Sequence, residues 1–101
     1  MDRKVKWSPE ALEDLEAIAE YVARDSLHYA SAIVSKVLSV SRSVGEFPLI
    51  GRIVPELMNQ NIRERFIYSY RLVYRIEANT ILIVAVIHGK RLFDDVEERF
   101  E

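Results

Sequence analysis

Apolar residues recur at helical spacing in two stretches of the N-terminal half of the chain. The first follows Ser8-Pro9-Glu10, a typical helix start, because Ser8 can cap free N–H groups and Pro9 fits the first helical turn. The second follows Asp25-Ser26 and stops near Gly45, before Pro48. The apolar positions are Ala11, Leu12, Leu15, Ile18, Ala19 and Val22, then Ala30, Ile33, Val34, Val37, Leu38 and Val44. The pattern predicts two amphipathic helices in an antiparallel hairpin.

From Gly51 onwards the apolar period changes to two, which is typical of strands. An edge strand closed by Pro55 is predicted, and the apolar run Thr80–Ile87 has the composition of a central strand. Ala78-Asn79 is a plausible hairpin turn before that run. The predicted strands are Val5–Trp7 and residues 52–54, 63–68, 70–76 and 80–87, followed by a possible short helix at 92–100. These elements predict an α+β domain of residues 1–101, of the type β-α-α-β-β-β, in which a mostly antiparallel sheet packs against the hairpin.

Composition limits the class of protein. Cysteine is absent, which excludes thiol chemistry and disulfides, and the apolar run Ile81–Ile87 is far shorter than a membrane span. No signal peptide is read at the N-terminus, so we expect a cytoplasmic location without membrane attachment. The net charge is −2, but residues 52–91 contain seven basic and three acidic side chains, a net charge of +4. The predicted sheet is therefore the cationic part of an otherwise acidic chain.

A series of short motifs along the chain resembles a known family. The motifs are Trp7–Ala11, Phe47–Arg52, Val54–Leu57, Tyr70–Ile76 and Val86–Arg91, in this order. They resemble the ParE/RelE superfamily, the toxins of type II toxin–antitoxin systems, and the ParE branch most closely. The resemblance implies growth inhibition by the free chain, a plasmid stabilisation role, and a cognate antitoxin as partner. For the ParE branch, it implies DNA gyrase as the inhibited target.

The RelE and YoeB branch implies a different function, ribosome-dependent cleavage of messenger RNA. Glu56, Arg71 and His88 match three positions of that branch, as base, phosphate-binding cation and acid. Gly89 stands where the branch has an aromatic residue, and residues 52–87 contain no lysine. A two-residue turn at Ala78-Asn79 would place Arg71 opposite Val86, with His88 as its diagonal neighbour on the same face, about 7–8 Å away. The position of Glu56 does not follow from the sequence.

Each of these residues also has a structural interpretation. Arg71 can form an ion pair with Glu56, and a histidine at a strand end is commonly a hydrogen-bonded structural residue. Arg63, Arg65 and Arg75 form either a basic groove for nucleic acid or antitoxin, or a solvated sheet face with Glu64 and Glu77 interspersed. The pair Lys90-Arg91, at the exit of the last strand, is the better candidate for target contact. Tyr68, Tyr70 and Tyr74 can stack on bases, although the last two share a face with core residues.

The sequence offers more apolar surface than one hairpin and one sheet face can bury. Ala17, Tyr21, Tyr29 and Val40 lie outside the main helical stripes, and a helical hairpin covers only one face of a sheet. We therefore expect an exposed patch on the second sheet face, covered by a segment of the antitoxin. Neither metal-ligand spacing nor a phosphate loop is present, so no cofactor is expected. Three functions remain: gyrase inhibitor, messenger-RNA endonuclease, and an orphan binding module without toxicity.

Overall fold

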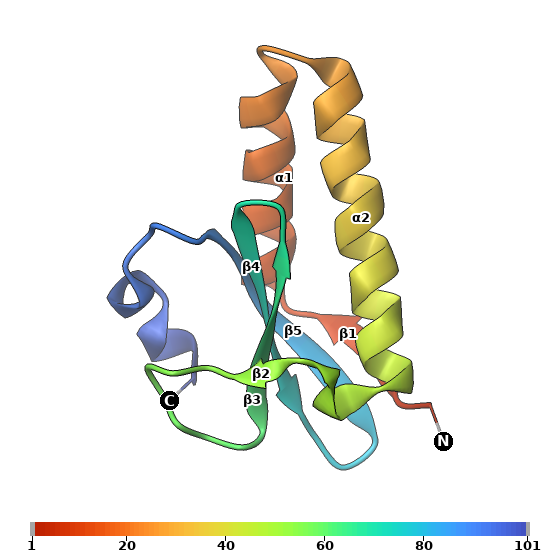
Figure 1. Ribbon diagram of the computed structural model, residues 1–101, viewed down its shortest axis with the longest axis vertical. Coiled ribbons are helices and arrows are strands. Elements are labelled where there is room, and N and C mark those ends of the chain that lie inside the picture. Colours follow the sequence, from red (N-terminus) through yellow and green to blue (C-terminus); the bar gives the residue numbers. More distant parts are fainter. Residues whose placement is uncertain (1, 101) are drawn as a thin grey trace.

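A helical hairpin lies on one face of a five-stranded sheet in the computed structural model, which describes residues 2–100 (Figure 1). The elements in chain order are β1 (Lys4–Trp7), α1 (Pro9–Ala23), α2 (Leu27–Glu46), the 3₁₀ turn η1 (Pro48–Ile50), β2 (Arg52–Ile53), β3 (Ile62–Ile67), β4 (Tyr70–Ile76), β5 (Thr80–His88), and the 3₁₀ turns η2 (Phe93–Asp95) and η3 (Glu97–Phe100). The strand order is β1-β5-β4-β3-β2, with β1 parallel to β5 and the other pairs antiparallel. The predicted α+β class with a mostly antiparallel sheet is confirmed.

Both helices begin at the serines that the sequence indicates. The Ser8 hydroxyl accepts a hydrogen bond from the N–H of Ala11, and the Ser26 hydroxyl accepts one from the N–H of Tyr29, each at 3.1 Å. These contacts satisfy N–H groups that have no partner inside the first helical turn. At the other end, α2 continues one residue past Gly45, where the helix passes closely over β1.

Three predicted elements differ in detail. The edge strand predicted at residues 52–54 forms as Arg52–Ile53, which pairs with β3, and Val54 lies just outside it, so the sheet has five strands, one more than the order β-α-α-β-β-β contains. Tyr68 falls in the β3–β4 turn with a positive φ of 53° instead of ending β3. The tail forms two 3₁₀ turns instead of one amphipathic helix.

The β4–β5 pairing contains a β-bulge that changes the predicted register. Tyr74 pairs with Ile83 as the two-residue turn predicts, but Val73 pairs with Ala85, so Val84 is an extra residue on β5. An extra residue reverses the facing of all later side chains, because strand side chains alternate between faces. Arg71 therefore pairs with Ile87 rather than with Val86, and the predicted register is wrong beyond the bulge.

The sheet carries an apolar core on each face. The first core lies between the sheet and the hairpin and includes Leu15, Val37, Leu72, Tyr74 and Val86. The second lies on the opposite face, where the returning tail contributes Phe93 and Val96. The prediction that this second face is open for an antitoxin is wrong, because the chain covers it with its own C-terminal residues (Figure 1). Within residues 2–100, none of the helices has the length and apolar character needed to cross a membrane.

Candidate functional site

A buried ion cluster lies on the second sheet face and is centred on Glu64. The Glu64 side chain has no exposed surface, and its two carboxylate oxygens accept hydrogen bonds from different arginines. The Nε of Arg71 donates to Oε1 and the Nε of Arg52 donates to Oε2, both at 2.6 Å. Glu64 and Arg71 come from directly adjacent strands, so the sheet itself fixes this geometry. Two charge-assisted hydrogen bonds compensate the burial of the carboxylate.

Glu56 completes the cluster from the segment that follows β2. Its carboxylate accepts two hydrogen bonds from the guanidinium of Arg71, at 2.8 Å from Nη2 and 3.0 Å from Nη1. These hydrogen bonds lower the pKa of Glu56, and the same contact raises the pKa of Arg71 above its ordinary value. The structural interpretation of Arg71 as the ion-pair partner of Glu56 is confirmed, and the fold supplies the placement of Glu56 that the sequence could not.

Each of the three guanidinium nitrogens of Arg71 donates a hydrogen bond, and one flat face of the group meets an aromatic ring. Glu64 binds its Nε, Glu56 binds its two Nη atoms, and the Phe93 ring lies 5.2 Å from the guanidinium carbon. The side chain of Arg71 retains only 7% of its exposure, whereas that of Glu56 retains 40%. An added anion would have to displace Glu56 to reach the guanidinium.

His88 lies on the other face of the sheet, next to the helices. It pairs with Tyr70, and the two rings meet edge to face at 5.5 Å. Its Nδ1 accepts a hydrogen bond from the N–H of Lys90 at 3.1 Å. Because Tyr70 and Arg71 are consecutive residues of one strand, their side chains project to opposite faces. The predicted convergence of Arg71 and His88 on one face is therefore wrong, and the β-bulge at Val84 is its cause.

The predicted basic groove is divided between the two faces. Arg63 and Arg65 pair with Tyr74 and Leu72, so they project toward the helix side of the sheet. Arg75 projects to the opposite face, where its guanidinium carbon lies 6.0 Å from the Phe100 ring. Arg63 is also fixed by hydrogen bonds to backbone carbonyls of Gly51 and Gln60. These three arginines do not form one surface, whereas Lys90 and Arg91 are both exposed where the chain leaves β5.

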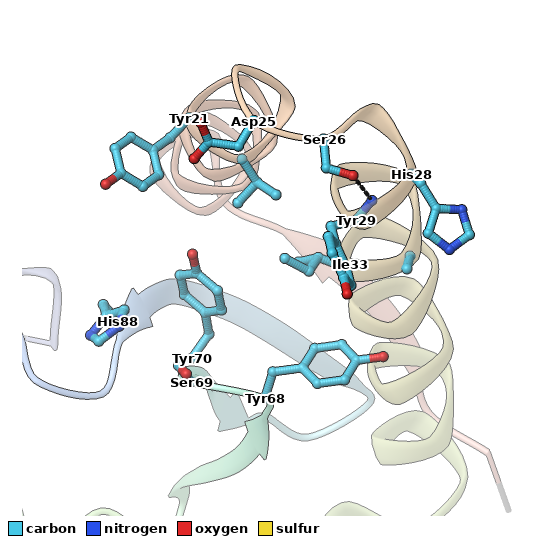
Figure 2. Close-up of a pocket in the computed structure, with 12 residues that line it drawn as sticks. Tyr21, Asp25, Ser26, His28, Tyr29, Ile33, Tyr68, Ser69, Tyr70 and His88 are labelled. Atoms are coloured by element: carbon cyan, nitrogen blue, oxygen red, sulfur yellow. Dashed lines mark hydrogen bonds between the residues drawn. The ribbon is translucent and has the colours of Figure 1, made fainter.

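A hollow of about 490 Å³ opens between the tip of the helical hairpin and the β3–β4 turn (Figure 2). We call it the tyrosine groove, because four of the five tyrosines of the chain line it, together with both histidines. Its lining residues include Tyr21, Tyr29, Ile33, Tyr68, Tyr70, His28 and His88. Tyr68 projects into this region from its positive-φ turn and is 68% exposed. A bulky residue held at positive φ is uncommon and often marks a functional surface.

The tyrosine groove continues along α1 toward its N-terminal half. A second hollow shares Tyr21, Tyr70 and His88 with it and extends to Asp14 and Arg91. The two hollows together follow α1 from Asp14 to Val22, about 12 Å at the usual helical rise, and continue to Asp25 just beyond its end. Tyr21 and Tyr29 are 67% and 66% exposed, which confirms them as surplus apolar residues, whereas Val40 is buried in the core.

Sequence reasoning missed two features of this molecule. Glu64 enters the sequence-based expectations only as one acidic residue of an alternative solvated face, although it lies in phase with the apolar Ile62 and close to Arg71 on the next strand. The tyrosine groove joins residues from the helix tip and the strand ends, which no local pattern connects. Among residues 2–100, the structure has no group of three or more side chains suited to holding a metal ion.

Comparisons with known proteins identify the family of this chain. The sequence pattern of the family described as "ParE toxin of type II toxin-antitoxin system, parDE" matches residues 5–93. A comparison with curated protein sequences finds no significant match.

Three solved structures have a similar fold. A chain of the chromosomal ParDE toxin–antitoxin system of P. aeruginosa has a TM-score of 0.70 at 19% identity, with 85% of this chain and 95% of that chain covered. A chain of the RelBE2 toxin–antitoxin complex of Mycobacterium tuberculosis has a TM-score of 0.58 at 21% identity, with 87% of this chain and 99% of that chain covered. A chain of the YoeB dimer of Staphylococcus aureus has a TM-score of 0.60 at 19% identity, with 87% of this chain and 98% of that chain covered. Because the family pattern matches residues 5–93, which is most of this chain, the chain belongs to the ParE toxin family of type II toxin–antitoxin systems.

Proposed function

We propose that this chain stops growth in the cytoplasm by binding DNA gyrase, and that it does not cut RNA. Its membership of the ParE family supports the toxin role. The observation that carries the choice of mechanism is the separation of Arg71 and His88 by the sheet. A surface-binding inhibitor needs no convergent catalytic groups, whereas a nuclease does.

RNA cleavage requires a base, an acid and a cation around one phosphate. The base and acid must each lie within hydrogen-bond reach of their proton, and the cation must face the developing negative charge. Here Arg71 is bound by two carboxylates, and His88 lies on the opposite face. One phosphate cannot contact both side chains without a rearrangement of β5.

The endonuclease remains the second candidate because of one contact. Glu56 and Arg71 form a bidentate pair, and Glu56 is 40% exposed, so a base and a cation of suitable type do lie together. A nuclease built on this pair would need an acid other than His88. The third candidate is an orphan chain that binds a partner without toxicity.

Induced expression in growing cells separates the three functions. Plasmid topology and transcript integrity are measured in the same culture, for the wild type and for His88→Ala. We expect loss of supercoiling or accumulation of cleaved DNA, intact transcripts, and unchanged toxicity of His88→Ala, because His88 is an exposed side chain. Transcripts cut within codons would support the nuclease, and normal growth would support the orphan module.

We also propose that the exposed basic pair Lys90 and Arg91 contacts the gyrase target. The double substitution Lys90→Ala/Arg91→Ala should weaken inhibition of purified gyrase in a supercoiling assay, because both side chains are exposed beside the tyrosine groove. Lys36→Ala is the matched control, since Lys36 is an exposed lysine on α2. Equal inhibition by all three proteins would remove this pair from the target interface.

The antitoxin of this chain is proposed to dock in the tyrosine groove. The groove is apolar and rich in tyrosine, the composition of a protein-binding surface, and its length suits an amphipathic helix of about three turns. The similar chains from P. aeruginosa and M. tuberculosis belong to toxin–antitoxin systems, which supports such a partner.

The antitoxin proposal is tested with the protein encoded beside this chain. Tyr68→Ser and Tyr29→Ser should each weaken its binding by about tenfold or more, measured by titration calorimetry, because exposed aromatic anchors carry much of an interface's energy. Leu49→Ser is the control, because Leu49 is equally exposed at 70% but lies outside the groove. A loss of affinity only in the control variant would place the antitoxin elsewhere.

A further inference from the structure

The apolar end of β5 is compatible with two registers against β4. All residues of Ile81–Ile87 are apolar, so the alternation of polar and apolar side chains that fixes the register of most strands is absent. In the observed register, Val86 packs on the helix side, and Ala85 and Ile87 pack on the second sheet face. A bulge-free register, shifted by one residue beyond Ile83, would reverse the faces of these three side chains. Because all three are apolar, hydrophobic burial alone does not fix the register.

The bulge turns two backbone groups toward an edge of β5 that has no strand beside it. The strand β1 ends at Trp7, which pairs with Ile83, and within residues 2–100 no other strand lies on this side of β5. The carbonyl of Val84 and the N–H of Val86 are directed to this edge, and the two residues are only 3% and 2% exposed. Buried backbone groups without a hydrogen bond are strongly unfavourable. The bulged register therefore needs hydrogen-bond partners from outside the sheet.

Asp14 and Arg99 provide these partners. The Oδ2 atom of Asp14, on α1, accepts a hydrogen bond from the N–H of Val86 at 3.0 Å. The Nη1 atom of Arg99 donates to the carbonyl of Val84 at 3.1 Å, whereas the hydroxyl of Ser8 lies 3.5 Å from the same oxygen. The two charged side chains also bind each other, at 2.7 Å from Nη1 to Oδ2 and 3.1 Å from Nη2 to Oδ1. Arg99 is 19% exposed and Asp14 is 11% exposed, so this pair takes the place of a strand at the bulge.

The C-terminal tail, residues 92–100, carries Arg99 to the bulge. Val96 is fully buried and Phe93 is 4% exposed, and both pack on the second sheet face. Phe93 and Phe100 stack on each other with ring centres 5.5 Å apart. The family pattern ends at residue 93, so Arg99 lies outside the matched region. The position of Arg99 therefore depends on the docking of the tail.

We propose that the Asp14–Arg99 pair is a register lock: the docked tail holds the bulge, and release of Arg99 lets residues 84–88 shift by one position against β4. Loss of Arg99 disfavours only the bulged register, because in the shifted register the carbonyl of Val84 faces β4 and rejoins the ladder. A one-residue shift also moves the chain after β5 by about 3.3 Å, so the tail cannot keep its seat. Tail docking and strand register are therefore coupled.

The lock determines the face on which His88 lies. In the shifted register His88 would lie opposite Ser69, on the sheet face that holds Arg71 and Glu56. The lock bears on the proposed function, because it maintains the separation of Arg71 and His88 on which that proposal rests. Strand pairing can be measured without growth or gyrase assays, so failure of the lock and failure of the gyrase proposal are distinguishable.

Nuclear magnetic resonance of the isotope-labelled full chain distinguishes the two registers. Leu72 lies opposite Val86 in the observed register and would lie opposite Ala85 after the shift. A cross-strand Hα–Hα NOE reports each pairing. The Leu72–Val86 NOE should dominate in wild type. In Arg99→Gln, the population with the Leu72–Ala85 NOE should rise about tenfold or more, because a charged hydrogen bond to the carbonyl of Val84 is lost.

Two control variants and a second contact make the test specific. Arg91→Gln removes only the exposed ion pair with Asp95, at 3.3 Å, and should behave as wild type does. The ring contact between Tyr70 and His88, at 5.5 Å, should weaken in Arg99→Gln in proportion to the shifted population. Arg99→Lys keeps a cation for Asp14 without the planar fork that also reaches β5, so it should show a smaller rise. This variant decides the question if Arg99→Gln does not fold.

Three results would overturn the lock. The first is a folded Arg99 variant of either kind that retains the Leu72–Val86 NOE alone. The second is an equal rise of the shifted population in Arg91→Gln. The third is unfolding of both Arg99 variants without the Leu72–Ala85 contact, because the pair would then stabilise the fold as a whole.

Discussion

Glu64 is the residue on which the charged cluster of the second face depends. It is a fully buried carboxylate that bridges Arg52 and Arg71 at 2.6 Å each, and Arg71 in turn holds Glu56. Removing one member of such a cluster leaves buried charge without compensation. The cluster is therefore a structural element of the face.

Glu64→Gln should destabilise the fold strongly. The amide keeps the shape of the side chain but leaves Arg71 with only one carboxylate, so we expect a loss of about 3 kcal/mol in the free energy of unfolding. Urea denaturation followed by circular dichroism measures it. Glu77→Gln serves as the control and should change stability by less than about 0.5 kcal/mol, because Glu77 is exposed. A Glu64 variant as stable as this control would refute the structural role.

Glu56 should give the stability a measurable pH dependence. Its pKa in the folded chain is lowered from 4.5 by the hydrogen bonds from Arg71. The stabilising contribution is therefore complete above the unfolded-state pKa and is lost as the pH falls through the lower folded-state pKa. The free energy of unfolding of wild type should exceed that of Glu56→Gln by about 1 kcal/mol or less at pH 7, since Glu56 is partly exposed.

That difference should shrink as the pH falls below about 4. Urea denaturation of both proteins at several pH values measures the trend. The other carboxylates are common to both proteins, so their contributions cancel in the difference between the two unfolding free energies. A difference that stays constant from pH 7 to strongly acid conditions would contradict this role of Glu56.

Among the elements, the helices were predictable from sequence because their signals are local. Ser8 and Ser26 lie directly before the apolar stripes, and each caps its helix as expected. The strand pairing was predictable only as far as Tyr74, because the β-bulge follows from packing between distant segments. The short strand β2 and the placement of Glu56 likewise depend on contacts with β3 and β4, which no local pattern encodes.

Gly45 fixes the close contact between α2 and β1. A Cβ atom at this position would lie 2.8 Å from Cγ2 of Val5 and 2.9 Å from the carbonyl oxygen of Arg3. Gly45→Ala should therefore destabilise the chain by about 1–3 kcal/mol through overpacking, although the same change inside a free helix is favourable. Thermal unfolding measures the sign of the change in stability. A stabilised variant would show that α2 can move away from β1.

On the scale of the whole molecule, the charge distribution opposes a general affinity for nucleic acid. The net charge is −2, and the basic residues of the sheet are divided between two faces, with Arg52 and Arg71 in ion pairs. Nucleic-acid binding relies on several phosphate contacts made together. The tertiary fold thus disperses a positive charge that appears concentrated in the sequence.

The purified chain should accordingly bind single-stranded RNA weakly. We expect dissociation constants above about 100 μM at physiological salt, the weak end of non-specific binding. Fluorescence anisotropy with a labelled oligonucleotide measures it over a range of salt concentrations. Micromolar binding with a steep salt dependence would instead favour the endonuclease candidate.

The extra residue at Val84 has a consequence for how this fold can change over evolutionary time. An in-frame loss of one codon before Ala85 would move the end of β5 by one step and bring the imidazole of His88 to the side of the sheet that holds Arg71. The same step would turn Ala85 and Ile87 toward the hairpin, so the neighbouring core would have to adjust. A single insertion or deletion is thus the shortest path between a chain that keeps these two side chains apart and one that unites them.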